Sequence, residues 1–212
     1  MSDENFAALA AAASIEQYPP HALLIAEGSL PQFLYIVVEG AVEMFGTHDR
    51  HETTIDIIRP VTAFILAEVM RDAVHLKSAR TLAPSRIVMI PAKTVRDVFE
   101  HDAAFARAIV RELADRYRCV VRSLKNEKLR SSAERLANWL LQTHAQQGHP
   151  HLIELAIDKR TLASSLGMTP ENLSRNLALL AKYGVKSSGR DILIDNAPAL
   201  SVFAKPNVLI DG

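Results

Sequence analysis

Cysteine is nearly absent from this chain of 212 residues, because Cys119 is the only one. A single cysteine excludes an internal disulfide. It also excludes an iron–sulfur cluster or a thiolate-only zinc site held by one chain, since such sites need about four ligands. The sequence also lacks a P-loop, a G-x-S-x-G element, an H-E-x-x-H pair and a dinucleotide fingerprint. We therefore expect a protein that is not an enzyme.

Long apolar runs are missing as well, and none approaches the ~18 residues that a membrane-spanning helix needs. The N-terminus, MSDENF, is polar and acidic, unlike the start of a signal peptide. We expect a cytoplasmic protein without a membrane partner.

Net charge is zero, yet the two signs are distributed unevenly along the chain. Residues 1–121 carry 12 basic and 16 acidic side chains, a net charge of −4, whereas residues 122–212 carry 12 basic and 8 acidic, a net charge of +4. A basic C-terminal part fits a DNA-binding end joined to an acidic domain.

Short strands separated by turns dominate residues 15 to about 91. The candidate strands are rich in β-branched and aromatic residues, and Gly28, Gly40 and Gly46 lie between them. This spacing predicts an all-β barrel or roll, preceded by a short alanine-rich helix over residues 7–13. The candidate strands are 23–25, 34–38, 41–45, 53–58 and 86–90.

A long helix is predicted over residues 102–127, because glycine and proline are absent between Pro91 and Gly148 and apolar residues recur at steps of three and four. Asp102 is suited to cap it. A long helix with one apolar stripe usually buries that stripe against a partner, so we expect a homodimer. The alternative is packing on the chain's own N-terminal domain. The stripe comprises Phe105, Ile109, Leu113, Tyr117, Val120, Val121 and Leu124.

A second helix is predicted to open at Ser131 with a capping box to Glu134 and to end near Gly148. Residues 126–131 are therefore a candidate hinge. The expected domains are 1–101, 102–127 and 128–212. A short strand is predicted over 152–157, and the histidines at 48, 51, 149 and 151 are expected at the surface.

The segment KRTLASSLGMTPENLSRNLALLAK, residues 159–182, has the pattern of a helix-turn-helix. Asp158 can cap the first helix and Gly167 can end it. Thr169 can cap the second helix, with Pro170 at its first position. The shared core is expected from Leu162, Ala163, Leu166, Leu173 and Leu177.

The N-terminal end of the second helix would enter the major groove. Glu171, Ser174 and Arg175 project on one face there, at spacings of three and four. Arg175 can donate two hydrogen bonds to guanine, and Glu171 can accept one from cytosine N4. The segment VKSSGRDILI after Gly184 has the pattern of a β-hairpin wing, whose Lys186 and Arg190 can neutralise phosphates.

The chain resembles the CRP/FNR family of dimeric transcription regulators over nearly its whole length. That resemblance implies an α+β fold with three parts: an N-terminal double-stranded β-helix, which is the cyclic-nucleotide-binding-type β-roll; a long dimerisation helix; and a C-terminal winged helix-turn-helix. The matching segments are 18–20, 24–28 and 33–40 in the N-terminal half, and 162–175 and 189–195 in the C-terminal half.

The Glu171, Ser174 and Arg175 arrangement is similar to the FNR branch, which implies palindromic sites of the TTGAT-N4-ATCAA kind. The resemblance also implies an activator that contacts RNA polymerase, and by analogy the 46–52 loop is a candidate patch. The iron–sulfur cysteines of FNR are missing here, so its oxygen-sensing chemistry is not expected.

The family's cyclic-nucleotide motif is degenerate in this chain. Nucleotide binders use a Gly-Glu pair on the ribose and an Arg-Ser-Ala triplet on the cyclic phosphate. One alignment puts Ala67, Glu68, Lys77 and Ser78 at those places, and another puts His75 at the phosphate arginine. In both, the bidentate fork of arginine is missing, so cyclic AMP is not the leading candidate effector.

An FNR-like helix with neither motif resembles the branches that respond to nitric oxide, oxygen or carbon monoxide through haem. His75 is the first candidate haem ligand and His21 the second, because imidazole is a common axial ligand. A small organic or cyclic-nucleotide effector, or none, is the alternative. The candidate effector pocket is Ala67, Glu68, His75, Lys77 and Ser78.

Overall fold

The computed structural model describes residues 1–49, 51–148, 150 and 152–211. The chain forms two compact units, Met1–Tyr117 and Arg118–Gly212. The expected α+β fold is confirmed, with a β-rich domain followed by a long helix and a winged helix-turn-helix. The boundary between the units falls inside the long helix, and the division at 1–101, 102–127 and 128–212 stays a prediction.

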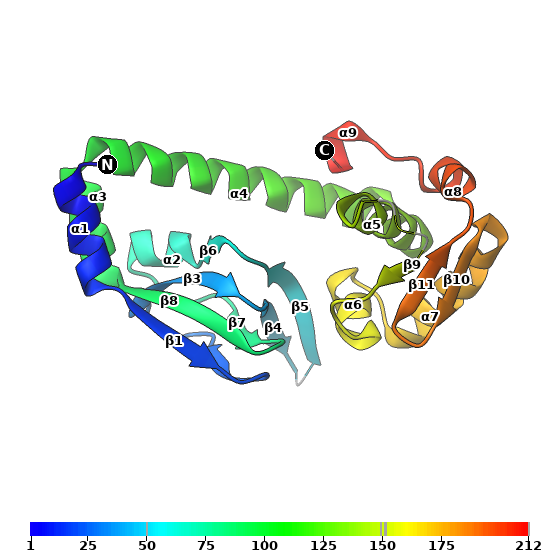
Figure 1. Ribbon diagram of the computed structural model, residues 1–212, viewed down its shortest axis with the longest axis horizontal. Coiled ribbons are helices and arrows are strands. Elements are labelled where there is room, and N and C mark those ends of the chain that lie inside the picture. Colours follow the sequence, from blue (N-terminus) through cyan, green and yellow to red (C-terminus); the bar gives the residue numbers. More distant parts are fainter. Residues whose placement is uncertain (50, 149, 151, 212) are drawn as a thin grey trace. The chain divides into compact units, whose positions relative to one another are not determined.

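The N-terminal unit is a roll of two four-stranded antiparallel sheets, ordered β1-β8-β3-β6 and β2-β7-β4-β5 (Figure 1). All five predicted strands are confirmed. Three further strands, β1, β6 and β7, pair with partners far along the chain. The bounds are β1 Ser14–Tyr18, β2 Leu23–Ile25, β3 Phe33–Glu39, β4 Val42–His48, β5 His51–Ile58, β6 Thr62–Phe64, β7 Ser78–Thr81 and β8 Ser85–Pro91.

Helices close this unit. The expected N-terminal helix is α1, Asp3–Ala12, and the long helix is α4, Ala103–Leu129; α2, Leu66–Arg71, and α3, Ala92–His101, were not predicted. Figure 1 shows α1 beside α3, and the two helices are in contact. The core between the sheets and helices is apolar, and its fully buried members include Val37, Val42, Ile87 and Val95.

Asp102 caps α4, as predicted. Its Oδ1 accepts hydrogen bonds from the amides of Ala104 and Phe105, both at 2.9 Å. Its Oδ2 accepts from the side chain of Asn5 at 3.0 Å and from the amide of Ser2 at 2.8 Å. These hydrogen bonds, with that of Asn5 the strongest influence, hold the pKa of Asp102 well below its ordinary value. One carboxylate thus starts α4 and anchors α1.

The apolar stripe of α4 divides into two parts. Ile109 is buried against the roll, and Phe105 and Leu113 pack beside it, which is the alternative considered for the whole stripe. Further along, Tyr117 is 70% exposed and Leu124 51% exposed. The second half of α4 therefore carries apolar side chains that are exposed in the single chain.

The C-terminal unit combines packed helices with a small antiparallel sheet ordered β10-β11-β9, which α7 contacts (Figure 1). Leu136, Leu162, Leu173 and Leu200 are fully buried between them. The bounds are α5 Ser132–Gln146, β9 Leu152–Glu154, α6 Lys159–Ser165, α7 Pro170–Leu180, the 3-10 turn η1 Ala181–Tyr183, β10 Val185–Ser188, β11 Asp191–Ile194, α8 Ala197–Ala204 and α9 Val208–Asp211.

The predicted capping box of α5 is confirmed. The hydroxyl of Ser131 accepts from the amide of Glu134 at 3.3 Å, and the carboxylate of Glu134 accepts from the amide of Ser131 at 2.9 Å. The predicted hinge over 126–131 is too long, because α4 continues to Leu129. Good helix formers occupy 127–129, so the break is confined to Arg130 and Ser131.

Two smaller expectations need correction. The strand predicted over 152–157 ends at Glu154, which pairs with Asp191 at the start of β11; beyond it a single backbone hydrogen bond runs from the amide of Leu155 to the carbonyl of Arg190 at 3.1 Å. The 46–52 loop is instead the tip of the β4–β5 hairpin, in which His48 pairs with His51. His48 and His51 are exposed as expected, whereas Arg50, His149 and His151 lie outside the described residues. In the described part of the chain, no helix is long and apolar enough to cross a membrane.

Candidate nucleic-acid interface and sensor site

The helix-turn-helix is built by the local signals that predicted it. Asp158 Oδ1 accepts from the amide of Thr161 at 2.7 Å and starts α6. Gly167 ends the helix with a left-handed φ of +61°. Thr169 Oγ1 accepts from the amide of Asn172 at 3.2 Å, and Pro170 is the first residue of α7.

Close packing fixes the two helices against each other. Ala163 is fully buried where α6 meets α7, so its methyl group allows a close approach. Leu162, Leu166, Leu173 and Leu177 are buried around it, as expected. The recognition helix α7 is therefore held on one face and open on the other.

The open face of α7 presents the predicted base-reading residues. Glu171, Ser174 and Arg175 are all exposed within its first two turns, next to the exposed Thr169 and Pro170. Hydrogen bonds from its own amide and from the Thr169 hydroxyl hold the pKa of Glu171 below its ordinary value, and Arg175 adds to this effect. Among the described residues, no hydrogen-bond partner holds the Arg175 guanidinium, which leaves its fork available to a guanine.

The wing is the β10–β11 hairpin, which turns at Gly189 with a φ of +59°. Lys186 and Arg190 are exposed, but both have partners within the chain. Lys186 Nζ lies 2.6 Å from Asp195 Oδ2, and Arg190 Nη2 donates to the carbonyl of Leu155 at 3.0 Å. Binding to phosphate would therefore compete with these contacts.

Lys159 is a cation of this surface that the sequence reasoning missed. It is the first residue of α6, and its Nζ donates to the hydroxyl of Ser187 in the wing at 2.8 Å. Its place at the start of the first helix of the helix-turn-helix was the available signal, because lysine side chains beside a recognition helix can contact phosphates.

The candidate effector residues of the roll come together only in part. Lys77 Nζ lies 3.0 Å from Glu68 Oε1, and the Glu68 side chain is buried. The hydroxyl of Ser78 on β7 accepts from the amide of Glu27 at 3.0 Å. Ala67 is exposed. The meeting of Glu68 and Lys77 favours the alignment that puts them at the ribose and phosphate positions.

His75 precedes β7 and is only 3% exposed. Its carbonyl accepts from the amide of Gly28 at 2.8 Å, and its amide donates to the carbonyl of Ser29 at 2.9 Å. Within the described part of the chain, its buried Nδ1 has no hydrogen-bond partner. Burial lowers the pKa of His75, against the opposing effect of Glu68, so the ring is neutral at pH 7.

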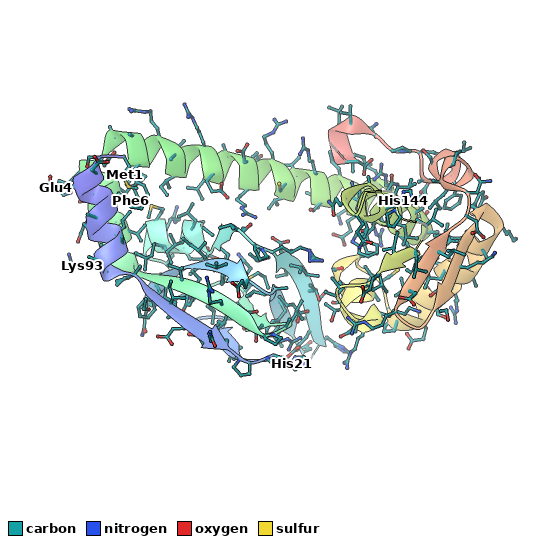
Figure 2. The ribbon with its side chains drawn as sticks, viewed as in Figure 1. Met1, Glu4, Phe6, His21, Lys93 and His144 are labelled. Carbon is teal, nitrogen blue, oxygen red and sulfur yellow. The ribbon has the colours of Figure 1, made fainter. Side chains whose placement is uncertain are left out.

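His21 lies elsewhere. It is exposed between β1 and β2, and its amide donates to the carbonyl of Thr81 at the other end of the β2–β7 pair from His75. Figure 2 shows its side chain at the tip of the roll, away from α1. Among residues 1–49, 51–148, 150 and 152–211, no cluster of three His, Cys, Asp or Glu side chains could hold a metal ion.

Two family models match this chain in succession. The cyclic nucleotide-binding domain matches residues 15–102, and the Crp-like helix-turn-helix domain matches residues 134–203. The chain belongs to the CRP/FNR family of transcription regulators. This CRP/FNR protein is therefore a DNA-binding regulator with a cyclic-nucleotide-binding-type sensor domain, and it is not an enzyme.

Solved structures share the fold of this CRP/FNR protein at low identity. A crp/fnr transcriptional regulator from Eubacterium rectale has a TM-score of 0.80 at 18% identity, covering 97% of this chain and 96% of that one. FixK2 from Bradyrhizobium japonicum has a TM-score of 0.77 at 21% identity, and the match covers 90% of this chain and 96% of FixK2. The c-di-GMP responsive regulator CLP from Xanthomonas campestris has a TM-score of 0.76 at 17% identity, and the match covers 91% of this chain and 99% of CLP. No curated protein sequence matches the chain.

Proposed function

We propose that this regulator binds palindromic promoter DNA as a homodimer, and that an effector in the β-roll controls the binding. The observation that carries the proposal is the shared exposed face of Glu171, Ser174 and Arg175 at the start of α7. The similarity of these residues to the FNR branch supports a TTGAT-N4-ATCAA palindrome, which two recognition helices would read about one DNA turn apart.

The exposed half of α4 supports the homodimer. Val110, Tyr117 and Leu124 are exposed and recur every seven residues, and the exposed Val120 follows Tyr117 by three. This is the a and d spacing of a coiled-coil seam. Val120 is 65% exposed in the single chain, and burying a whole apolar side chain of this size contributes about 1.5–3 kcal/mol.

A dimer test compares the full palindrome with a single half-site by fluorescence anisotropy at fixed salt, together with the solution mass. We expect Val120→Asp to be monomeric and to lose its preference for the full palindrome. Cys119→Asp adds the same charge one residue earlier, away from the seam, and should stay dimeric. A wild-type monomer with equal affinity for both DNAs would overturn the proposal.

For the effector, we propose haem bound through His75, with a diatomic gas as the signal. The buried imidazole with an unpartnered Nδ1 fits a side chain that bonds a group outside the chain, and the lowered pKa favours the neutral, ligating form. His75 would hold the haem, which would supply an iron able to bind nitric oxide, oxygen or carbon monoxide. The exposure of His21 favours His75 over it.

A small organic effector is the second candidate. The Glu68–Lys77 pair neutralises the two charges that a nucleotide would use, and lysine lacks the fork of arginine. A cyclic mononucleotide therefore has to break an existing ion pair. The similar regulator CLP is described as c-di-GMP responsive, which keeps a larger nucleotide among the alternatives.

The effector test titrates haem into the protein and records the visible spectrum, with His75→Ala and His21→Ala beside the wild type. We expect a stoichiometric Soret band that shifts or weakens in His75→Ala and is unchanged in His21→Ala. A wild-type protein without a specific band would remove haem and leave an organic effector or none.

The regulator would act in the cytoplasm, where promoter DNA lies, and as an activator it would recruit RNA polymerase. The exposed hairpin tip around His48 is the candidate contact. Transcription in vitro from a promoter with the palindrome should rise with the wild type, and less with His48→Ala. Equal transcription with and without the protein would argue against activation.

A further inference from the structure

The joint between α4 and α5, Arg130 and Ser131, is fastened to the C-terminal segment of the chain. Arg130 Nη1 and Nη2 donate to Asp211 Oδ1 and Oδ2, each at 2.6 Å. The two side chains are 7% and 15% exposed. A bidentate arginine–carboxylate pair fixes orientation as well as distance, and burial protects this one from salt. Figure 1 shows α9 beside this joint.

Residues 205–211, which we name the C-terminal clip, contact every element that meets at the joint. Besides the ion pair, the clip is held by the last turns of α4, by the joint and by α5. The additional contacts are Lys125 Nζ to the Leu209 carbonyl at 3.3 Å, Arg130 Nη2 to the Lys205 carbonyl at 3.4 Å, Gln142 Nε2 to the Asp211 carbonyl at 3.4 Å, and Lys205 Nζ to Glu134 Oε1 at 3.3 Å.

The joint is in turn bonded to the helix-turn-helix through Arg135 on α5. Its Nη1 donates to the carbonyl of Arg130 at 3.0 Å. Its Nε and Nη2 donate to the carbonyls of Leu166 and Gly167 at 2.9 and 3.2 Å. One guanidinium therefore spans the joint and the turn between α6 and α7.

A second contact reaches the recognition helix itself. Asn176, a buried residue of α7, donates from Nδ2 to the hydroxyl of Ser132 at 3.0 Å. Ser132 is the first residue of α5, directly after the joint. The end of α4, the joint and α7 thus form one continuous hydrogen-bonded assembly, and the clip closes it.

We propose that Asp211 and Arg130 are positioning residues for DNA binding. The clip fixes the angle between the end of α4 and the recognition helix, and thereby the half-site spacing that the dimer accepts. The inference rests on the proposed function, because only a dimer paired through α4 converts this angle into a distance between two recognition helices. Without Asp211, the charge of Arg130 is left buried and unpaired, which favours opening of the joint.

The test measures binding to palindromes with four, five and six base pairs between the half-sites, by fluorescence anisotropy at one salt concentration. We expect the wild type to prefer one spacing. Asp211→Asn keeps the size of the side chain and removes its charge, and should reduce that preference by about fivefold or more, within the ordinary range of coupling between sites. Asp115→Asn, an exposed position on α4, should keep the wild-type preference.

Two further measurements separate positioning from a general loss of folding. Asp211→Glu should restore most of the spacing preference, because it can re-form the ion pair. Removing residues 206–212 leaves Arg130 open to water, so this variant should fold and still show the relaxed preference. Amide hydrogen exchange at 130–132 should be faster in Asp211→Asn than in the wild type, with no DNA present.

The outcomes distinguish the two proposals. If the wild type prefers one spacing and Asp211→Asn prefers it equally, with unchanged exchange at 130–132, the clip has no positioning role. If the wild type shows no preference among the spacings, the palindromic homodimer is wrong. The hydrogen exchange then decides by itself whether the clip holds the joint.

Discussion

The two units of this protein differ in the exposure and the internal contacts of their candidate functional side chains. In the C-terminal unit, Glu171, Ser174 and Arg175 are exposed on a helix whose start is set by its own cap and proline. In the N-terminal unit, the candidate effector residues are mostly buried, and Glu68 and Lys77 are bound to each other. A surface that meets rigid DNA can be built in advance from local signals, whereas a sensor must exchange internal contacts for an effector.

The largest effects on stability are expected where a side chain in the core of either unit is truncated. Leu173→Ala on α7 and Ile87→Ala on β8 each remove a fully buried side chain, and each should cost about 2–5 kcal/mol of unfolding free energy. Urea denaturation followed by circular dichroism and by the fluorescence of Trp139 in α5 measures both. Only Leu173→Ala should shift the tryptophan transition strongly.

Matched controls exist on the same elements or sheets. Leu179→Ala on α7 and Ile15→Ala on β1 truncate exposed side chains and should stay within about 0.5 kcal/mol of the wild type. If Leu173→Ala and Ile87→Ala shift the unfolding transition of Trp139 fluorescence equally, the two units unfold together. The difference between the units would then not extend to their stability.

The next effect sharpens the contrast inside the sensor. Glu68→Gln, Lys77→Met and the double variant form a cycle around the 3.0 Å ion pair, and we expect a coupling of about 1 kcal/mol. Because either single change leaves the other group unpaired, the double variant should be more stable than the sum of the singles. Additive changes in unfolding free energy would show that the Glu68–Lys77 ion pair does not stabilise the roll.

A similar magnitude is expected at the joint. Ser131→Ala removes the cap of α5 and should destabilise the C-terminal unit by about 1 kcal/mol. Thermal denaturation followed by Trp139 fluorescence measures it. Ser123→Ala, an exposed position on α4, should be neutral or slightly stabilising. A neutral Ser131→Ala would contradict the capping box as the element that begins α5.

The smallest effect is expected in acid and concerns the N-terminal unit. The pKa of Asp102 lies below its unfolded value of about 3.9. The carboxylate therefore stabilises the fold above that pH, and this contribution is lost as the pH falls toward the folded pKa. Asp102→Asn should be less stable than the wild type at pH 7. Its free energy of unfolding should also fall less than that of the wild type between pH 5 and about 2. Parallel melting curves for both proteins across this range would refute the assignment.

The same contrast explains what the sequence could and could not predict. Helix ends depend on nearby side chains, so Asp102, Ser131, Asp158 and Thr169 predicted them correctly. Strands β1, β6 and β7 depend on partners far along the chain and carry weak local patterns, so they were missed. The hinge was drawn too long because nothing local distinguishes residues 127–129 from the rest of α4.

The candidate site follows the same division. The exposed face of α7 could be predicted because a cap and a helical period fix which side chains project together. The contacts of Arg190 with Leu155, of Lys186 with Asp195 and of Arg130 with Asp211 could not, since each joins residues whose proximity is a result of folding. The sequence ranked His75 before His21 as a candidate ligand but could not predict that His75 is buried and His21 exposed.

The most direct test of the account is the specificity of Arg175→Ala, measured as the ratio of affinities for the TTGAT-N4-ATCAA palindrome and a scrambled duplex at fixed salt. A bidentate guanine contact predicts a loss of about 1–3 kcal/mol on the palindrome and little on the scrambled DNA. Lys186→Ala is the comparison, because loss of a phosphate contact weakens both DNAs alike. If Arg175→Ala also weakens both DNAs equally, Arg175 does not read a base, and the central claim is wrong.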